Sequence, residues 1–85
     1  MKRIGVIGII IQARTAETAL EVQKLLSEYS SVIVGRMGVP VPESGVSAIS
    51  VIVRGENETI SALNGKLGRI PNVNVKSALS GVEIQ

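Results

Sequence analysis

The segment Ile4–Ile11, which reads IGVIGIII, decides the fold of this chain. Every residue in it is either glycine or β-branched and apolar, a composition typical of a strand that is covered on both faces. The segment is too short to cross a membrane as a helix, which needs about 20 residues. We therefore expect a buried strand, and the rest of the chain must supply what covers it.

Apolar residues at helical spacing predict two helices in the chain. Thr15 can cap the first helix and Asn57 the second, because both side chains accept hydrogen bonds from free backbone N–H groups. Pro71 ends the second helix, since proline cannot continue the helical hydrogen bonds. The apolar stripes are Ala19, Val22, Leu26 and Tyr29 in the first helix and Ile60, Leu63, Leu67 and Ile70 in the second.

Three further apolar segments predict strands: one from Val32 towards Met37, one over 46–53 and one over 73–79. The resulting order is βαββαβ, and matching residues of the two halves, such as Ile9 and Val51, lie 41 or 42 positions apart. Two such halves predict a single domain over residues 1–85 with an α+β, ferredoxin-like fold: a four-stranded antiparallel sheet with two helices on one face. The second and fourth strands are at the edges, which suits Pro40 and Pro42, because prolines belong in loops or edge strands.

Two helices cover only one face of the predicted sheet, yet both faces are apolar. From the likeness of the halves, we expect the helix-facing residues to be Ile7, Ile9, Ile11, Val32, Val34, Ile49, Val51, Val53, Val73 and Val75. The uncovered face then carries Val6, Gly8, Ile10, Ile33, Met37, Ser50, Ile52 and Ala78. Monomers rarely expose such a patch, so we predict that it forms the interface of a homo-oligomer, a dimer or a tetramer. The alternative is a mildly hydrophobic face that stays exposed.

The composition argues against most chemistry. The chain has no histidine, cysteine, aspartate, tryptophan or phenylalanine, although 45% of it is hydrophobic. Zinc and iron–sulfur sites need Cys or His ligands, and nucleophilic triads need a base such as His, so we predict no metal, no cofactor, no catalytic residue and no enzymatic activity. The alternative of a small enzyme that uses Glu and Lys ranks low. The lack of cysteine fits a cytoplasmic protein.

Membrane and nucleic-acid partners are not expected. No apolar segment is long enough to span a bilayer. The net charge is only +2 and the basic residues are scattered, whereas nucleic-acid binding needs clustered ones. The RNA-binding domains that share this topology stack bases on aromatic residues of the sheet, and the one aromatic residue here, Tyr29, is predicted on a helix.

Two glycine-containing segments are candidates for ligand contact. Gly35-Arg-Met-Gly38 allows close approach of a ligand to the backbone, and Arg36 can bind a carboxylate or phosphate; alternatively the segment is a strand bulge with Arg36 in solvent. The segment Gln12–Thr15 lies before a helix, whose free N–H groups favour anions, although simple capping by Thr15 is favoured. Gly65 is expected to let its helix approach another backbone.

Over nearly its whole length, the sequence resembles a family of small bacterial proteins described as regulators of the iron-only hydrogenase system. The resemblance is carried by Arg3-Ile-Gly-Val-Ile7, Ile33-Val-Gly-Arg-Met-Gly-Val-Pro40, Gly45-Val-Ser47, Gly65-Lys-Leu-Gly68, Pro71-Asn-Val73 and Val75-Lys-Ser-Ala-Leu79. It implies a ferredoxin-like domain akin to ACT domains and to the effector domain of nickel-responsive repressors, domains that assemble through their sheets and hold small ligands at subunit boundaries. Nickel sensing is not implied, because the chain has neither His nor Cys, and no DNA-binding segment is present.

Together these observations predict an oligomeric, ligand-responsive regulatory module. The effector site is expected near Gln12, Arg14 and Thr15, or around Gly35, Arg36, Met37, Gly38 and Pro40 together with Lys76 and Ser77. Arg36 and Lys76 would anchor a small anionic effector. The alternative function is a non-catalytic accessory or scaffold protein that docks on a protein partner through its sheet.

Overall fold

The computed structural model describes residues 2–12, 16–41 and 45–84. Its elements are β1 (Lys2–Ile11), α1 (Ala16–Glu28), the short 3-10 helix η1 (Ser30–Val32), β2 (Ile33–Val41), β3 (Val46–Glu56), α2 (Asn57–Gly68) and β4 (Val73–Ile84). The predicted order of strands and helices is confirmed. β1 begins earlier and β2, β3 and β4 end later than predicted, and β2 begins at Ile33 because Val32 belongs to η1. The predicted cap Thr15 and the loop residue Pro42 lie outside the described residues. Asn57 is the first residue of α2 rather than its cap.

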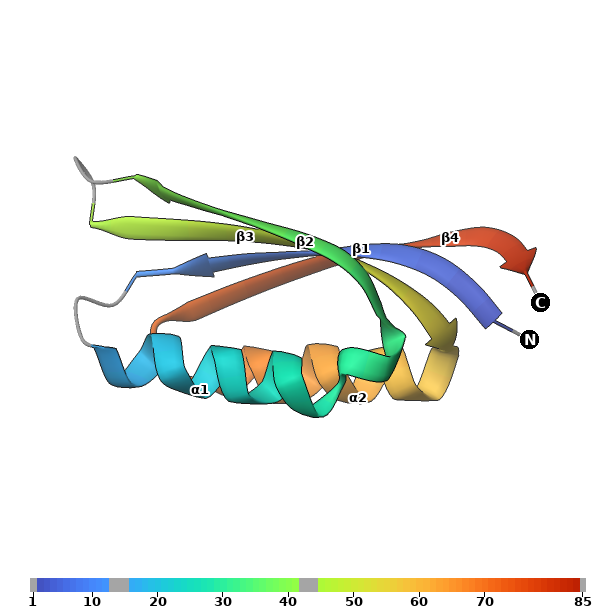
Figure 1. The fold of residues 1–85 in the computed structure, drawn as a ribbon, viewed down its shortest axis with the longest axis horizontal. Helices are drawn as coiled ribbons and strands as arrows, with labels where there is room; N and C mark the ends of the chain where they lie inside the picture. The colour runs from blue at the N-terminus through green and yellow to red at the C-terminus, as the bar shows by residue number, and fades with distance from the viewer. Residues whose placement is uncertain (1, 13–15, 42–44, 85) are drawn as a thin grey trace.

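The four strands form one antiparallel sheet in the order β2-β3-β1-β4. β1 lies in the interior of the sheet, with Ile7 opposite Val51 of β3 and Ser77 of β4. Both helices lie on the same face of the sheet (Figure 1). The ferredoxin-like fold and the two edge strands are therefore as predicted, and Pro40 lies in the edge strand β2.

The core lies between the sheet and the two helices. Its fully buried side chains alternate along β1 and β3, as expected of strands that face a helix layer on one side. Leu25, Tyr29, Ile49, Val73 and Val75 pack against this core and are partly buried, whereas Ala19, predicted in the helical stripe, is exposed. The buried cluster consists of Ile7, Ile9, Ile11, Val22, Leu26, Val51, Val53, Ile60, Leu63, Leu67 and Ile70.

A bulge at the start of β2 corrects one part of the prediction. Ile33 pairs with Val53, but Gly35, two residues later, pairs with Ile52, so β2 carries one extra residue. The extra residue reverses the alternation of side chains along the strand. Ile33, which we expected on the uncovered face, packs against the core, and Val34, which we expected to face the helices, is 64% exposed.

Close packing demands glycine at Gly5 but not at Gly65. A Cβ atom at Gly5 would lie 3.0 Å from the carbonyl oxygen of Ala78 and 3.0 Å from Cδ1 of Leu79. A Cβ atom at Gly65 would meet nothing within 4 Å, so the expected close approach of α2 to another backbone does not occur there among the described residues. A side chain at Gly5 would therefore crowd β4, whereas Gly65 only weakens its helix.

We expect Gly5→Ala and Gly65→Ala to change stability in opposite directions. The methyl group at Gly5 has to displace backbone and should cost about 1–3 kcal/mol, as overpacking does. Gly65→Ala removes the helix penalty of glycine and should add about 1 kcal/mol to the free energy of unfolding. Urea denaturation of the two variants measures both effects, and equal effects would contradict the packing described at Gly5.

Because of the bulge, we expect truncation of the neighbouring residues Ile33 and Val34 to have different effects on the free energy of unfolding. Ile33→Ala removes a side chain that packs against the core and should lower the free energy of unfolding by about 1–3 kcal/mol. Val34→Ala truncates an exposed side chain and should change it by less than about 0.5 kcal/mol. A larger loss for Val34→Ala in the same denaturation experiment would show that the bulge is misplaced.

Candidate functional site

The sheet face opposite the helices is apolar and uncovered, and we call it the open face. Three rows of its side chains cross all four strands, and beyond Val6 and Ile52 the face continues with Ile4 and Arg54 and then with Lys2 and Glu56. The outer rows are mostly apolar, and the central row contains the polar residues Ser50 and Lys76. The rows are Gly35, Ile52, Val6 and Ala78; Met37, Ser50, Gly8 and Lys76; and Val39, Ala48, Ile10 and Asn74.

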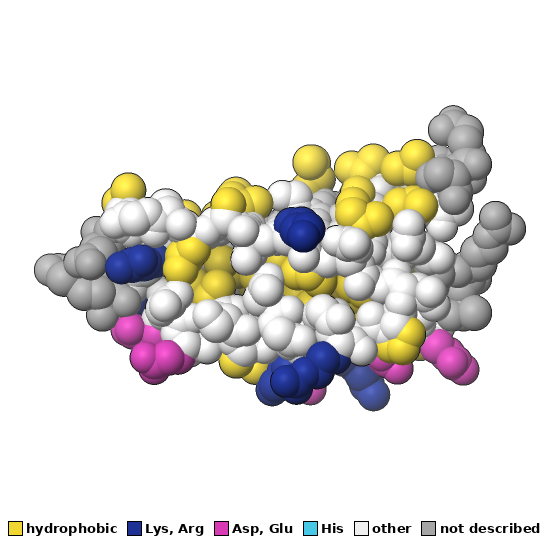
Figure 2. All heavy atoms as spheres, turned by 180° about the vertical axis from the view of Figure 1, so that it is seen from behind, with side chains coloured by type: hydrophobic (Ala, Val, Ile, Leu, Met, Phe, Trp, Pro, Cys, Tyr) yellow, Lys and Arg dark blue, Asp and Glu magenta, His cyan; other side chains and the backbone are white. Residues whose placement is uncertain are grey.

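Large hydrophobic side chains of the open face meet solvent. Met37 is 65% exposed, and Val6, Ile10, Val39 and Ile52 are also among the exposed large hydrophobic residues. In Figure 2, hydrophobic side chains gather along the upper margin, on the sheet side of the molecule, and the acidic side chains gather along the lower, helix side, while basic side chains are seen in both halves. The hydrophobic side chains of the sheet layer are therefore available for contact with an apolar surface.

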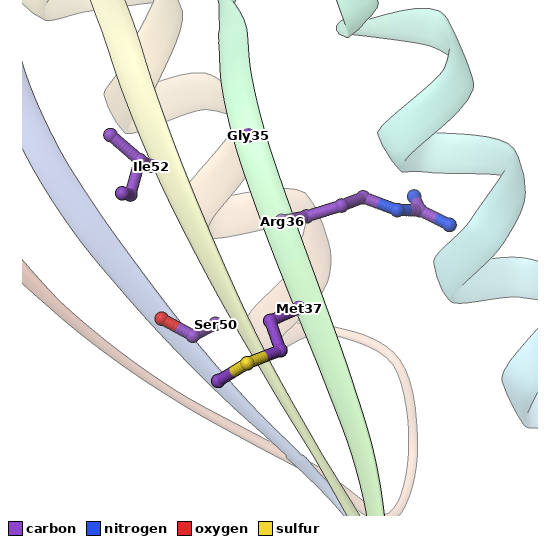
Figure 3. Close-up of a pocket in the computed structure, with 5 residues that line it drawn as sticks. All are labelled: Gly35, Arg36, Met37, Ser50 and Ile52. Atoms are coloured by element: carbon purple, nitrogen blue, oxygen red, sulfur yellow. The ribbon is translucent and has the colours of Figure 1, made fainter.

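A groove of about 300 Å³ runs along the open face beside the edge strand β2, lined by Gly35, Arg36, Met37, Ser50 and Ile52. Gly35 creates the space, because a Cβ atom built there would meet nothing within 4 Å. Figure 3 shows the side chains of Met37, Ser50 and Ile52 on one side of the strands and that of Arg36 extending the other way, towards α1. The walls of the groove are thus apolar, and the Ser50 hydroxyl is its polar side-chain group.

Arg36 belongs to the helix side of the sheet. It lies opposite Val51 of β3, a buried residue on the helix side, and its guanidinium donates a hydrogen bond to the side-chain oxygen of Gln23 on α1. This contact connects the edge strand to the helix layer. Arg36 also borders a second hollow of about 290 Å³ with Leu26, Ser27, Ser30 and Ile33.

The residues predicted to bind an effector fall into separate places. Gly35 and Met37 line the groove on the open face. Gly38 and Pro40 lie on the other side of β2, where they border a hollow beneath α1 together with Gln23. These two groups cannot contact one small ligand at the same time, because the sheet lies between them.

Lys76 and Ser77 lie on β4, at the opposite edge of the sheet from β2. Lys76 pairs with Gly8 on the open face, and Ser77 pairs with Ile7 on the helix side. Arg36 and Lys76 are therefore on different edges and different faces, so one chain does not bring them to a common anion. The predicted anchoring of one anion by both remains a prediction only for an assembly of several copies.

The alternative site before α1 is only partly described. The backbone N–H of Gln12 donates a 2.8 Å hydrogen bond to the carbonyl of Asn72, which ties the end of β1 to the turn before β4. Asn72 has a φ of 66°, the left-handed conformation that asparagine tolerates in turns. Arg14 and Thr15 lie outside the described residues.

Tyr29 does not lie on the sheet and so cannot stack a nucleic-acid base there. It follows α1 and packs against the core, and Nζ of Lys66 lies 5.1 Å from the centroid of its ring. Hydrogen bonding to the Tyr29 hydroxyl and electrostatic attraction to it raise the pKa of Lys66 above its usual value. This contact between the partly buried Tyr29 and the exposed Lys66 links the end of α1 to α2 on the helix side of the molecule and leaves the open face without an aromatic residue.

The described part of the chain has neither a cluster of metal ligands nor a helix that could span a membrane. Within residues 2–12, 16–41 and 45–84, no group of three or more acidic side chains is placed to hold a metal ion. Among the helices that the structure describes, none is long and apolar enough to cross a membrane.

The roles of three residues of the site, Ser50, Ile52 and Gln23, could not be predicted from the sequence. Ser50 and Ile52 were predicted for the interface and not for a groove, since the groove depends on the register that sets Gly35 opposite Ile52. Gln23 was not predicted at all, because a contact between a helix and an edge strand leaves no local pattern. The glycine at Gly35, next to an arginine and a methionine, was the one signal available.

Comparison with known proteins gives this geometry a context. Residues 3–77 match the model of a protein family described as "TM1266-like: Iron-only hydrogenase system regulator, putative". A search of curated proteins found no match. The structure is similar to that of the uncharacterized protein TM1266 from Thermotoga maritima, with 34% sequence identity and a TM-score of 0.89 over 93% of this chain and 98% of the other.

More distant structures share the fold alone. The C-terminal domain of the MgtC protein from Mycobacterium tuberculosis is 12% identical, with a TM-score of 0.70 over 92% of this chain and 87% of that domain. A formyltetrahydrofolate deformylase from Pseudomonas putida is 12% identical, with a TM-score of 0.62 over 88% of this chain and 28% of the enzyme. The same fold thus occurs alone and as one part of a larger protein, and it does not by itself indicate a function.

Proposed function

Because the chain belongs to the iron-only hydrogenase system regulator family, we propose that it is a non-catalytic regulatory module, similar to ACT domains, that binds a small ligand and assembles with copies of itself through the open face. The observation that carries this proposal is the groove in an exposed apolar sheet face. An exposed apolar patch marks an interaction surface, and a concave part within it marks the place where a small molecule fits.

The groove has the chemistry of a binding site and lacks that of a catalytic one. Met37 and Ile52 offer apolar walls and Ser50 offers a hydroxyl, which suits recognition of a small, mostly apolar molecule. The one ionisable residue in the lining, Arg36, directs its guanidinium to Gln23 on the opposite side of the sheet. General acid–base catalysis needs a titratable group within hydrogen-bond reach of the substrate, and the described lining directs none into the groove.

Ligand binding would act on assembly by mass action. A ligand that binds only the assembled form stabilises that form by about 2.7 kcal/mol when its concentration is 100 times its Kd. A change of this size is enough to move a weak dimer from mostly dissociated to mostly assembled. A protein partner that binds only the assembled form, or only the dissociated form, would then respond to the ligand concentration.

Native mass spectrometry of the protein purified from cells tests this proposal directly, because it weighs the assembly and any bound small molecule together. A discrete oligomer that carries a reproducible small added mass supports it. An oligomer without added mass favours the alternative of a scaffold that docks on a protein partner. A monomer at high concentration overturns the role of the open face.

Charge substitutions offer a matched pair for the interface. Ile52→Lys places an ammonium group on the open face and should weaken self-association by at least about a hundred-fold, because the buried charge would have no anionic side chain beside it. Leu20→Lys, which alters a 62% exposed residue of α1 on the helix side, should leave the assembly unchanged. Light scattering after size-exclusion chromatography measures both, and an unchanged mass for Ile52→Lys would contradict the proposal.

A second substitution separates the groove from the fold. Gly35→Val fills the groove, yet a new Cβ atom meets no neighbour within 4 Å, so the free energy of unfolding should change by less than about 1 kcal/mol. The melting-temperature increase that a ligand gives the wild-type protein should disappear in this variant. Retention of the full increase would place the ligand elsewhere on the molecule.

A further inference from the structure

The open face is large enough to form a dimer interface by itself. All four strands lie side by side from Gly5 to Ile11 of β1, and three strands continue from Lys2 to Ile4; with strands spaced by about 4.8 Å and residues by about 3.4 Å, the footprint is about 600 Å². Two such faces bury about 1,200 Å² in total, at the lower limit of the range of specific protein–protein interfaces. A second copy of this chain is therefore an occupant of sufficient size.

Symmetry leaves two main ways to place one open face on another. A twofold axis in the interface and across the strands puts each strand over its own copy. With this axis on the central row, Lys76 faces the partner's Lys76, and two like charges meet in an apolar interface at high cost. With the axis at the centre of the whole face, between Val6 and Ile7, the two lysines still lie over the same edge strand, about 10 Å apart along it. A twofold axis along the strands instead puts β2 over β4 and β3 over β1, and every row of the open face meets its own copy in reversed order.

The second arrangement matches the residues of the central row. Met37 faces the partner's Lys76, and Ser50 faces the partner's Gly8, where the missing side chain leaves room. The two lysines lie at opposite edges of the interface, so their repulsion is small. Facing sheets usually cross at about 30°, which moves the partner's Lys76 by about 4 Å along the strands, less than the spacing of about 7 Å between rows. The match therefore survives the twist of the sheets.

This arrangement completes the groove. The partner's Lys76 closes the space bordered by Gly35, Met37, Ser50 and Ile52 and brings a positive charge to apolar walls. An ammonium group held against apolar walls favours an anionic partner, and none of the residues in the three rows is acidic. A ligand with one carboxylate and a small apolar body meets both requirements.

We propose that two copies pack open face to open face about a twofold axis along the strands, and that the groove of one copy and the partner's Lys76 together bind a small carboxylate with an apolar body. The inference rests on the proposed function and names its ligand class. It also explains how Lys76 and the segment around Met37, at opposite edges of one chain, contribute to one site. Two equivalent sites form in each dimer.

Cross-linking tests the arrangement without any ligand, and the absence of native cysteine removes background reaction. Facing sheets lie about 10 Å apart, too far for a disulfide, so a short bis-maleimide is the suitable reagent. Met37→Cys and Lys76→Cys change exposed side chains and should leave the fold intact. We expect a covalent dimer when the two variants, distinguished by mass, are co-expressed, and none when either variant is present alone. Cross-linking of either variant with itself, or of none, overturns the arrangement.

Hexanoate and its uncharged counterpart hexan-1-ol test the ligand class. We expect hexanoate to raise the melting temperature of the wild-type protein more than hexan-1-ol does, and Lys76→Gln to weaken hexanoate binding by about ten-fold. Lys24→Gln, which alters an exposed lysine of α1, is the control and should bind hexanoate like the wild type. Equal effects of the two probes, or no effect of either, overturn the proposed carboxylate site.

The two experiments separate this inference from the proposed function. A dimer with a bound small molecule in native mass spectrometry, but without the mixed cross-link, overturns the twofold arrangement and the role of Lys76 while the regulatory module stands. A monomer that neither probe stabilises overturns both.

Discussion

The structure depends on one constraint: two helices cover one face of a sheet whose two faces are both apolar. Both α-helices of the described residues lie on the same face of the sheet. The face that packs on α1 and α2 supplies the core, in which Ile9, Val51 and Leu63 are completely buried. The other face holds Val6, Ile10, Met37 and Ile52 in contact with solvent, and burial of such side chains is worth about 25 cal/mol per Å². The same alternation that stabilises the fold thus creates the strongest reason for it to associate.

Most of the fold could be predicted from the sequence because it depends on periodicity. The stripe Ile60, Leu63, Leu67 and Ile70 and the alternation of Ile7, Ile9 and Ile11 are local patterns, and all seven residues are buried in the structure. The bulge at Ile33–Gly35 could not be predicted, because an extra residue in an edge strand leaves the local pattern apolar while it reverses the faces. The internal repeat even favoured the wrong orientation for Val34, because it aligned Val34 with Val75 and so predicted that Val34 faces the helices.

The candidate site was predictable only in part for a related reason. Gly35 and Met37 attracted attention as sequence features, but the groove is made by the register of β2 on β3, which places Ser50 and Ile52 beside them. The contact between Arg36 and Gln23 joins residues 13 positions apart in different elements and has no signature in the sequence. Residues such as Arg36 and Lys76 looked like one anion site because the sequence shows charge and not the face of the sheet on which it lies.

The two edges of the sheet differ in a way that limits growth. β2 begins with a bulge and contains Pro40, which has no backbone N–H to donate, so a further strand cannot pair along it regularly. The stretch of β4 from Val73 to Leu79 has neither proline nor register shift. Head-to-tail addition of chains, with β4 of one copy joined to β2 of the next, is therefore disfavoured, whereas pairing of β4 with β4 of a second copy ends after two copies. These features of β2 oppose extension of so apolar a sheet into filaments.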